Sequence, residues 1–325
     1  MVTDKRDIAD IERGIFKRWG VEPESMQVQV ESCLGGIYTT YVPAQEEVGN
    51  DPIVLFHGFG AGSVFWAPNI QRLSARHSVY TLDLPGFGRS GRPRFEDDET
   101  LAELQMVQCI EQWRKTVSIN KMFIVAHSFA AFLISSYALE HPCRISHLFL
   151  VDPWGFPEKP RLTAKQIDPQ VYLHLITRVI LYFNPFALLR LSGSYASTLL
   201  RSLRPDMRKK LSNGVKEGSD DIYEYITYCN TRYPSGEMVY KSMTNSEGWA
   251  KRPMCRRFCG IAPSVPTTFI FGSKSFVDPG PVIDIQTVRD AYVDVQILRG
   301  AGHLVNIDAA KDFDNIVLTA IAQTF

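Results

Sequence analysis

The chain has 325 residues, of which 45% are hydrophobic, an ordinary share for a globular protein with a sizeable core. Lysine and arginine together number 35, as do aspartate and glutamate, so the formal net charge at pH 7 is zero. This balance argues against a nucleic-acid partner, because binding to a phosphate backbone calls for a strongly basic surface.

Other classes of protein are disfavoured by local features. Residues 1–7 hold no apolar run of the kind that a signal peptide needs. The most apolar stretch, residues 173–191, is interrupted by Arg178, Pro185 and Arg190, which argues against a transmembrane helix. The 6 cysteines lack metal-ligand spacing and predict free thiols in a reducing compartment. We therefore expect a cytoplasmic protein that needs no metal and no organic cofactor.

The chain opens with an amphipathic pattern followed by strand patterns. Residues 7–20 predict a helix whose apolar face carries Ile8, Ile11, Ile15, Phe16 and Trp19. That face packs either on the domain or on a membrane. Alternating patterns at residues 27–31 and 36–42 predict two strands, and the apolar run at 53–56 is typical of a buried parallel strand.

From residue 53 onward, predicted strands and helices alternate. Strand patterns occupy residues 78–82, 121–126 and 145–151, and helix patterns occupy 101–113 and 128–140. This order predicts an α/β protein with a mostly parallel sheet and helices on both of its faces.

The alternation stops at Pro153 and resumes with strand patterns at residues 265–271 and 293–298. Residues 155–263 carry helical patterns without strand runs. We therefore predict three parts: an amphipathic N-terminal helix within residues 1–25, a core formed by residues 26–154 and 264–325, and a helical lid, residues 155–263, inserted after the sixth main strand.

Ser128 stands where a predicted strand runs directly into a predicted helix. A serine at such a junction is typical of a nucleophile elbow, a strained turn that exposes the hydroxyl above the sheet. The turn needs small residues two positions away on each side, and Ala126 and Ala130 take the places of the more common glycines. The alternative is a serine that only caps the helix.

A glycine-rich segment, His57-Gly58-Phe59-Gly60, follows the apolar run at residues 53–56. A loop at this place supplies one backbone N–H to an oxyanion hole, and the residue after the nucleophile supplies the other. The predicted donors are Phe59 and Phe129. The alternative is a glycine-rich turn around a buried histidine.

The candidates for the general base and its acid partner follow the last two predicted strands. His303 lies in a glycine-rich turn after the last strand, and an imidazole titrates close to neutral pH. Asp278, after the strand that resumes beyond the lid, is the predicted acid that orients His303. Asp152 and Asp284 are competitors for that role. The order serine, aspartate, histidine is that of the α/β-hydrolase fold.

Further stretches resemble one subfamily of that fold. They are Val151-Asp152-Pro153-Trp154-Gly155-Phe156-Pro157 and residues 183–185, 203–206, 228–230, 234–237 and 248–254. In these the chain is similar to the abhydrolase-domain proteins that include the N-acylphosphatidylethanolamine lipase and the lipid-droplet coactivator of adipose triglyceride lipase. The resemblance runs from about residue 53 to the end. It implies an α/β-hydrolase fold and lipid chemistry.

The resemblance implies one of three activities. The first is a lipase or phospholipase type of serine hydrolase, with a glycerolipid or lysophospholipid substrate, which the presence of Ser128 favours. The second is acyl transfer to lysophosphatidic acid, because His303 and Asp308 form the H-x4-D pattern associated with it; the alternative for Asp308 is a residue that stabilises a helix N-terminus. The third is activation of a partner, a patatin-like triglyceride lipase.

The lid also carries a pattern that suits a lipid surface. Residues 171–191 are rich in apolar side chains, and cationic side chains follow them: Arg201, Arg204, Arg208, Lys209, Lys210, Lys251, Arg252, Arg256 and Arg257. Apolar surface beside cations suits acyl chains and anionic headgroups. This predicts peripheral association with lipid droplets or membranes; the alternative is a lid core with solvated charges.

Overall fold

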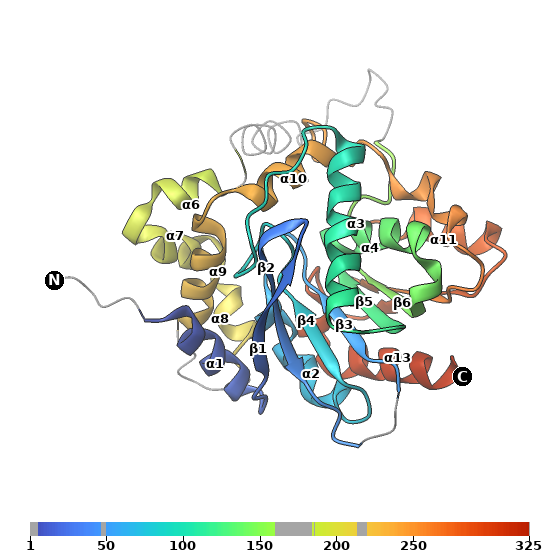
Figure 1. Ribbon diagram of the computed structural model, residues 1–325, viewed down its shortest axis with the longest axis horizontal. Helices are drawn as coiled ribbons and strands as arrows, with labels where there is room; N and C mark the ends of the chain where they lie inside the picture. The colour runs from blue at the N-terminus through green and yellow to red at the C-terminus, as the bar shows by residue number, and fades with distance from the viewer. Residues whose placement is uncertain (1–5, 47–49, 160–183, 185, 213–219, 325) are drawn as a thin grey trace.

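The computed structural model describes residues 6–46, 50–159, 184, 186–212 and 220–324. Its centre is an eight-stranded sheet in the order β1-β2-β4-β3-β5-β6-β7-β8 (Figure 1). The strands are β1 (Glu24–Val30), β2 (Cys33–Val42), β3 (Ile53–Phe56), β4 (Val79–Leu82), β5 (Met122–His127), β6 (Ile145–Val151), β7 (Thr267–Gly272) and β8 (Val293–Leu298). β2 pairs antiparallel with β1 and β4, and the other pairs are parallel, so the predicted α/β class is confirmed.

Helices cover both faces of the sheet and bury two separate cores. One core lies under α3 (Glu99–Thr116), α4 (Phe129–Glu140) and α11 (Gly280–Val288). The other lies under α1 (Ile8–Arg18), α2 (Ala67–Leu73) and α13 (Ala310–Gln323). Successive side chains of a strand point to opposite faces, so Val54 and Phe56 enter the first core and Ile53 and Leu55 the second. Burial on both faces explains why β3 is apolar throughout.

Helix α1 packs on the protein, which decides between the two interpretations of its apolar face. Ile11, Ile15 and Phe16 are buried in the second core. Beside them, Arg6 and Arg18 form ion pairs with Asp221 at 2.6 and 2.8 Å. None of the helices in the described ranges is both long enough and apolar enough to cross a bilayer.

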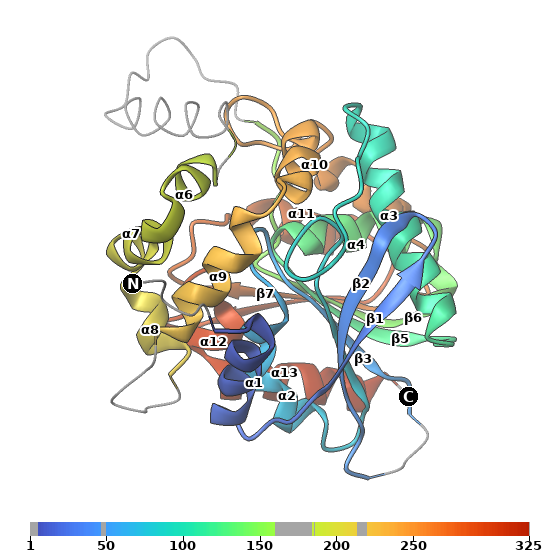
Figure 2. The same cartoon turned by 60° about the vertical axis from the view of Figure 1, so that its left-hand side comes forward.

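The segment between β6 and β7, residues 155–263, is called the lid segment below. Its described part contains α6 (Ala187–Leu191), α7 (Ala196–Leu203), α8 (Asp206–Lys210), α9 (Asp221–Thr231) and α10 (Ser235–Met243), and none of its described residues joins the sheet. Figure 2 shows α6, α7, α9 and α10 gathered on one side of the molecule, above α1. Its division from the core at residues 155 and 263 stays a prediction.

Candidate active site

Ser128 lies in the sharp turn between β5 and α4. Its backbone angles are φ 56° and ψ −117°, a region that residues other than glycine rarely adopt. The amide of Ser128 donates to Val151 O at 2.9 Å, and its carbonyl accepts from Ala131 N at 3.0 Å. Ser128 occupies the N-cap position of α4, but its side chain makes no capping hydrogen bond, so capping does not account for the serine. Ala126 and Ala130 are fully buried in the turn, which therefore accommodates both methyl groups.

A chain of hydrogen bonds joins Ser128 to a histidine and an aspartate from two other loops. His303 Nε2 lies 3.0 Å from Ser128 Oγ, and His303 Nδ1 lies 2.5 Å from Asp152 Oδ2. Because a carboxylate accepts a hydrogen bond, Nδ1 carries the proton and Nε2 presents its lone pair to the serine hydroxyl. This arrangement can turn a serine hydroxyl into a nucleophile.

Asp152, and not Asp278, is the acid that contacts His303. Asp152 directly follows β6 and is fully buried, where it also accepts hydrogen bonds from Ser275 Oγ and from the Gly272 amide. Asp278 is exposed and accepts instead from Gly280 N at 2.9 Å. The prediction that Asp278 orients His303 is therefore wrong.

The turn after β7 explains this difference. Asp278 lies several residues beyond Gly272, the last residue of β7, at the start of α11. The intervening residues fill the space beside the imidazole: the Phe276 ring lies 4.7 Å from the His303 ring, centroid to centroid. Asp284, the other competitor, lies exposed on α11. Both carboxylates line the cavity described below without approaching His303 as Asp152 does.

A second histidine, His127, contacts both the ring and the backbone of His303, and the sequence did not predict this contact. Its Nε2–H donates to the backbone carbonyl of His303 at 2.8 Å, and the two rings lie 4.7 Å apart. Burial, followed by the neighbouring His303, lowers the pKa of His127 to about 3. His127 is thus neutral at physiological pH and holds the His303 backbone. Its place directly before Ser128 was the available signal in the sequence.

The two predicted oxyanion donors lie beside Ser128. Phe59, Phe129 and Ser128 line the same cavity, and neither phenylalanine amide donates to another group in the part of the chain that the structure describes. The loop of Phe59 comes very near the elbow, because a Cβ atom on Gly58 would lie 2.7 Å from His127 Nδ1 and 3.0 Å from Ser128 Cβ. Only glycine fits there.

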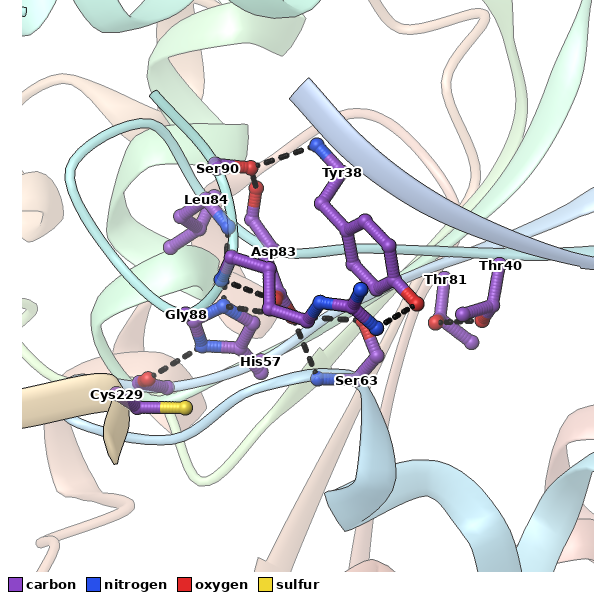
Figure 3. A network of polar contacts seen from close by, with 12 residues as sticks. Tyr38, Thr40, His57, Ser63, Thr81, Asp83, Leu84, Gly88, Ser90 and Cys229 are labelled. Atoms are coloured by element: carbon purple, nitrogen blue, oxygen red, sulfur yellow. Dashed lines mark hydrogen bonds and ion pairs between the residues drawn. The ribbon is translucent and has the colours of Figure 1, made fainter. Parts of the chain in front are cut away.

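A buried polar network ties down the loop that carries Phe59 (Figure 3). His57 Nε2 accepts from the Leu84 amide at 2.9 Å, and its Nδ1–H donates to Gly58 O at 2.8 Å. Burial lowers the pKa of His57, which keeps the ring neutral. Next to it, the buried Asp83 accepts from the amide and the hydroxyl of Ser63, each at 2.7 Å. The sequence did not predict that Asp83 stabilises this part of the site.

Ser128 and His303 open into a cavity of about 1250 Å³ between the core and the lid segment. Its aromatic wall consists of Phe59, Phe129, Trp154, Tyr240, Trp249 and Phe276. Tyr240 of α10 anchors this wall, with its ring 4.4 Å from Phe59 and 4.9 Å from Trp154. The apolar lining and the size suit a long acyl chain.

The lid surface that the sequence predicted is described in part. Residues 171–183 and 185 of the predicted apolar stretch lie outside the described residues. Of those described, α6 and α7 with their link expose Leu188, Leu191, Tyr195 and Leu203. Several predicted cations form ion pairs: Arg201–Asp220, Arg204–Asp206, Lys210–Asp308, Lys251–Glu99, Arg252–Glu103, Arg256–Glu158 and Arg257–Glu103. Leu188 and Leu191, which belong to the described part of the predicted apolar stretch, are thus exposed, whereas many of the predicted cations are paired with carboxylates.

Asp308, the second residue of the predicted acyltransferase pattern, is not among the residues that line the cavity. Its carboxylate contacts the Gly302 amide and Lys210. The spacing of the pattern therefore does not bring its two side chains together at Ser128.

Known proteins resemble this chain over most of its length. It is 43% identical over 316 residues to the abhydrolase domain-containing protein lid-1 of Caenorhabditis elegans, covering 96% of this chain and 87% of that protein. It is 42% identical to the 1-acylglycerol-3-phosphate O-acyltransferase ABHD5 of Rattus norvegicus, covering 82% and 76%. It is 39% identical to the (lyso)-N-acylphosphatidylethanolamine lipase of Homo sapiens, covering 86% and 81%.

The family assignment agrees with the architecture. The sequence model of the alpha/beta hydrolase fold matches residues 51–310, which hold β3 to β8 together with Ser128 and His303. The sheet order and the serine turn after β5 are those of that fold. This chain is a member of the α/β-hydrolase family, in the abhydrolase-domain subfamily that the sequence comparison predicted.

Proposed function

We propose that this protein is a serine hydrolase that cleaves acyl esters of glycerophospholipids or lysophospholipids. One observation carries the proposal. The Ser128 hydroxyl, 3.0 Å from His303 Nε2, lies at an apolar cavity large enough for an acyl chain, and His303 is oriented by the buried Asp152.

Acylation begins when Ser128 Oγ attacks the ester carbonyl and His303 Nε2 takes the hydroxyl proton. The amide N–H groups of Phe59 and Phe129 donate to the oxygen that becomes negative. Asp152 accepts from Nδ1–H and stabilises the imidazolium. When the tetrahedral intermediate collapses, the bond to the alcohol oxygen breaks, His303 gives its proton to that oxygen, and the lyso product leaves.

Deacylation repeats these steps with water. His303 removes a proton from a water molecule that attacks the acyl-Ser128 ester, and the same two amides stabilise the second tetrahedral intermediate. His303 then protonates Ser128 Oγ as the fatty acid leaves. No other chemical group is consumed, so the net reaction adds one water to one ester bond.

The substrate class is supported by the cavity wall and by the relatives. Six aromatic side chains line the cavity into which the serine opens, which favours an apolar acyl group over a polar one. One relative, 39% identical, is named as a lipase of N-acylphosphatidylethanolamine.

Labelling with a fluorophosphonate tests this proposal. Wild-type protein should be labelled and should release fatty acid from lysophospholipid vesicles, whereas Ser128→Ala should do neither. The control is Ser135→Ala, since Ser135 lies buried in α4 and donates to Ala131 O rather than to His303. Absence of label on folded wild-type protein contradicts the proposal.

A second candidate function is transfer of the acyl group to lysophosphatidic acid. It is favoured by the relative at 42% identity, which is named as a 1-acylglycerol-3-phosphate O-acyltransferase. In this reaction a lysophospholipid hydroxyl replaces water as the attacker of the acyl-Ser128 ester. Measuring phosphatidic acid against free fatty acid in one reaction separates the two activities, and Ser128→Ala should abolish both.

A third candidate function is non-catalytic activation of a patatin-like triglyceride lipase at a lipid droplet or membrane. The exposed leucines of α6 and α7 favour this kind of surface, because an exposed apolar patch marks a site that binds protein or lipid. Stimulation of such a lipase by Ser128→Ala protein, equal to that by wild type, would support this function. Loss of stimulation with the serine would assign the effect to catalysis.

A further inference from the structure

The loop that carries His303 is held at two backbone atoms. On one side of His303, the amide of Gly302 donates to Asp308 Oδ2 at 2.9 Å. On the other, the carbonyl of His303 accepts from His127 Nε2 at 2.8 Å. The imidazole itself bonds to Ser128 and Asp152. The ring therefore depends on the position of this short backbone stretch.

Asp308 reaches this loop from the end of α12 (Val305–Asp308). The residue as a whole is exposed, but its side chain is only 15% exposed because it folds back over Gly302. A Cβ atom at residue 302 would lie 3.2 Å from Asp308 Oδ2, so the carboxylate sits directly against the loop backbone. A carboxylate that accepts from a backbone amide makes one of the stronger hydrogen bonds in a protein.

The other oxygen of the same carboxylate leads to the lid segment. Asp308 Oδ1 forms an ion pair with Lys210 Nζ, at the end of α8. The Lys210 side chain is 25% exposed, so the pair is partly shielded from solvent. Helix α8 is itself held in place, because Met207 is buried and the Tyr223 hydroxyl donates to Arg204 O at 2.9 Å. One carboxylate thus joins a lid helix to the loop of His303.

We propose that Asp308 is a positioning residue for His303 and that its ion pair with Lys210 couples helix α8 of the lid segment to the proposed general base. The inference rests on the proposed serine hydrolase function. In this role Asp308, the aspartate of the H-x4-D pattern, keeps His303 in position and does not contact the acyl group. A displacement of α8 would then shift Asp308, the Gly302 backbone and, through it, the imidazole of His303.

Three substitutions separate the two contacts of Asp308. Asp308→Ala removes both, Asp308→Asn keeps an oxygen for the Gly302 amide but loses the ion pair, and Lys210→Met loses only the ion pair. The matched controls are Asp312→Asn and Lys209→Met, which change exposed neighbours of the same charge.

The expected result is a split between kcat and KM. Asp308→Ala should lower kcat and the rate of fluorophosphonate labelling about 100-fold, the scale of a small misplacement of a catalytic group, with little change in KM. Asp308→Asn should recover most of that loss. Lys210→Met should match Asp308→Asn, and the double variant Lys210→Met/Asp308→Asn should be no worse than either, because both remove one interaction.

A measurement that needs no activity accompanies the kinetics. Hydrogen exchange of the Gly302 amide, followed by NMR, should be faster in Asp308→Ala than in wild type and unchanged in Asp312→Asn. Labelling of the wild type tests the proposed function separately, so a loss of that function does not imitate a failure of this inference.

Equal kcat for Asp308→Ala and Asp312→Asn would overturn the positioning role. Additive effects of Lys210→Met and Asp308→Asn would overturn the coupling to α8. If Asp308→Ala does not fold, the kcat of Asp308→Asn and of Lys210→Met, each compared with wild type and with the matched controls, still decides the matter: values equal to wild type would overturn the coupling.

Discussion

The carboxyl ends of the strands, where Ser128 lies, and the lid segment next to them are built differently. At these strand ends, Ser128 and Asp152 are buried, and the backbone at Gly58 passes so close to His127 that a Cβ atom would not fit. The described lid helices α6 and α7 instead expose leucines to solvent. A close-packed site keeps donors and acceptors in place before substrate arrives. An exposed apolar surface instead favours binding, because its removal from water lowers the free energy.

Side-chain contacts between the two regions are polar as well as aromatic. Asn230 of α9 donates to Gly60 O at 2.8 Å, next to the loop of Phe59. Arg92 of the core donates to Cys229 O at 2.9 Å. The lid segment thus contacts the loops beside the site through hydrogen bonds as well as through ring contacts.

The largest expected effect distinguishes the two aspartates. Asp152→Asn should lower kcat about 10⁴-fold, because an amide in place of the acid allows the wrong tautomer of His303. Asp278→Asn should change kcat less than about twofold, since this carboxylate is exposed and bonds to the Gly280 amide rather than to the imidazole. Steady-state kinetics on a soluble ester measures both. A large effect of Asp278→Asn with a small effect of Asp152→Asn would reverse the assignment.

Gly58→Ala should disturb the contact between the loop of Phe59 and the turn of Ser128. The added methyl group would meet His127 and Ser128, so the loop must move and the Phe59 amide with it. We expect kcat to fall about 10²- to 10³-fold, the usual loss when one oxyanion donor is displaced.

The lid offers a glycine control for this change. Gly193→Asn should be tolerated, because nothing lies within 4 Å of its Cβ position and asparagine accepts a φ of 53°. Activity of Gly58→Ala equal to that of Gly193→Asn would show that Phe59 has no part in the reaction.

Leu188→Ser/Leu191→Ser should separate chemistry from surface binding. The two side chains are 62% and 84% exposed, so their loss should leave the fold intact. If they enter a lipid surface, binding to phospholipid vesicles should weaken about tenfold or more, while hydrolysis of a soluble ester stays the same. Vesicle sedimentation and ester kinetics measure the two quantities. Unchanged vesicle binding would remove α6 from the lipid-binding surface.

The smallest expected effect concerns the pH dependence of stability at α1. Tyr38 donates to Glu12 Oε1 at 2.6 Å, and burial, followed by the nearby Asp83, raises the pKa of Glu12 to about 7 from the usual 4.5. The folded protein therefore binds this proton more tightly than the unfolded chain does. The resulting stability is fully present below pH 4.5 and is lost as the pH rises through about 7.

Glu12→Gln should flatten this dependence. Between pH 4.5 and 7, the free energy of unfolding should fall less steeply than in wild type, by up to about 1.4 kcal/mol per pH unit for one proton. Urea unfolding at several pH values gives the slope, and the exposed Glu22→Gln is the control. Equal slopes for the wild type and Glu12→Gln would mean that Glu12 is not the group that titrates.

Much of the site followed from local patterns. Ser128 and His303 were predicted because each lies in a short turn at the end of a strand, and strand ends are visible as breaks in an apolar run. The same rule led to Phe59 and Phe129, since the proposed oxyanion donors are backbone amides next to such turns. Neither Ala126 nor Ala130 prevented the elbow from forming.

The acid could not be chosen correctly in this way, because all three candidates are aspartates and two of them, Asp152 and Asp278, follow strands. The choice depends on where two separate loops place their carboxylates around one imidazole. Asp152 follows β6 immediately and is buried, whereas the turn that contains Ser275 and Phe276 carries Asp278 out to the surface. The side-chain pattern of neither segment indicates which carboxylate will lie beside His303.

Side-chain periodicity and residues adjacent in the chain were enough to predict the α/β class, the order of the core strands and the turns that carry Ser128 and His303. The contacts of His303 with Asp152 and His127, and the contact of Asp308 with Lys210 of the lid segment, could not be predicted from such local patterns. Those contacts join residues far apart in the chain, so they exist only once the sheet has brought its strand ends together.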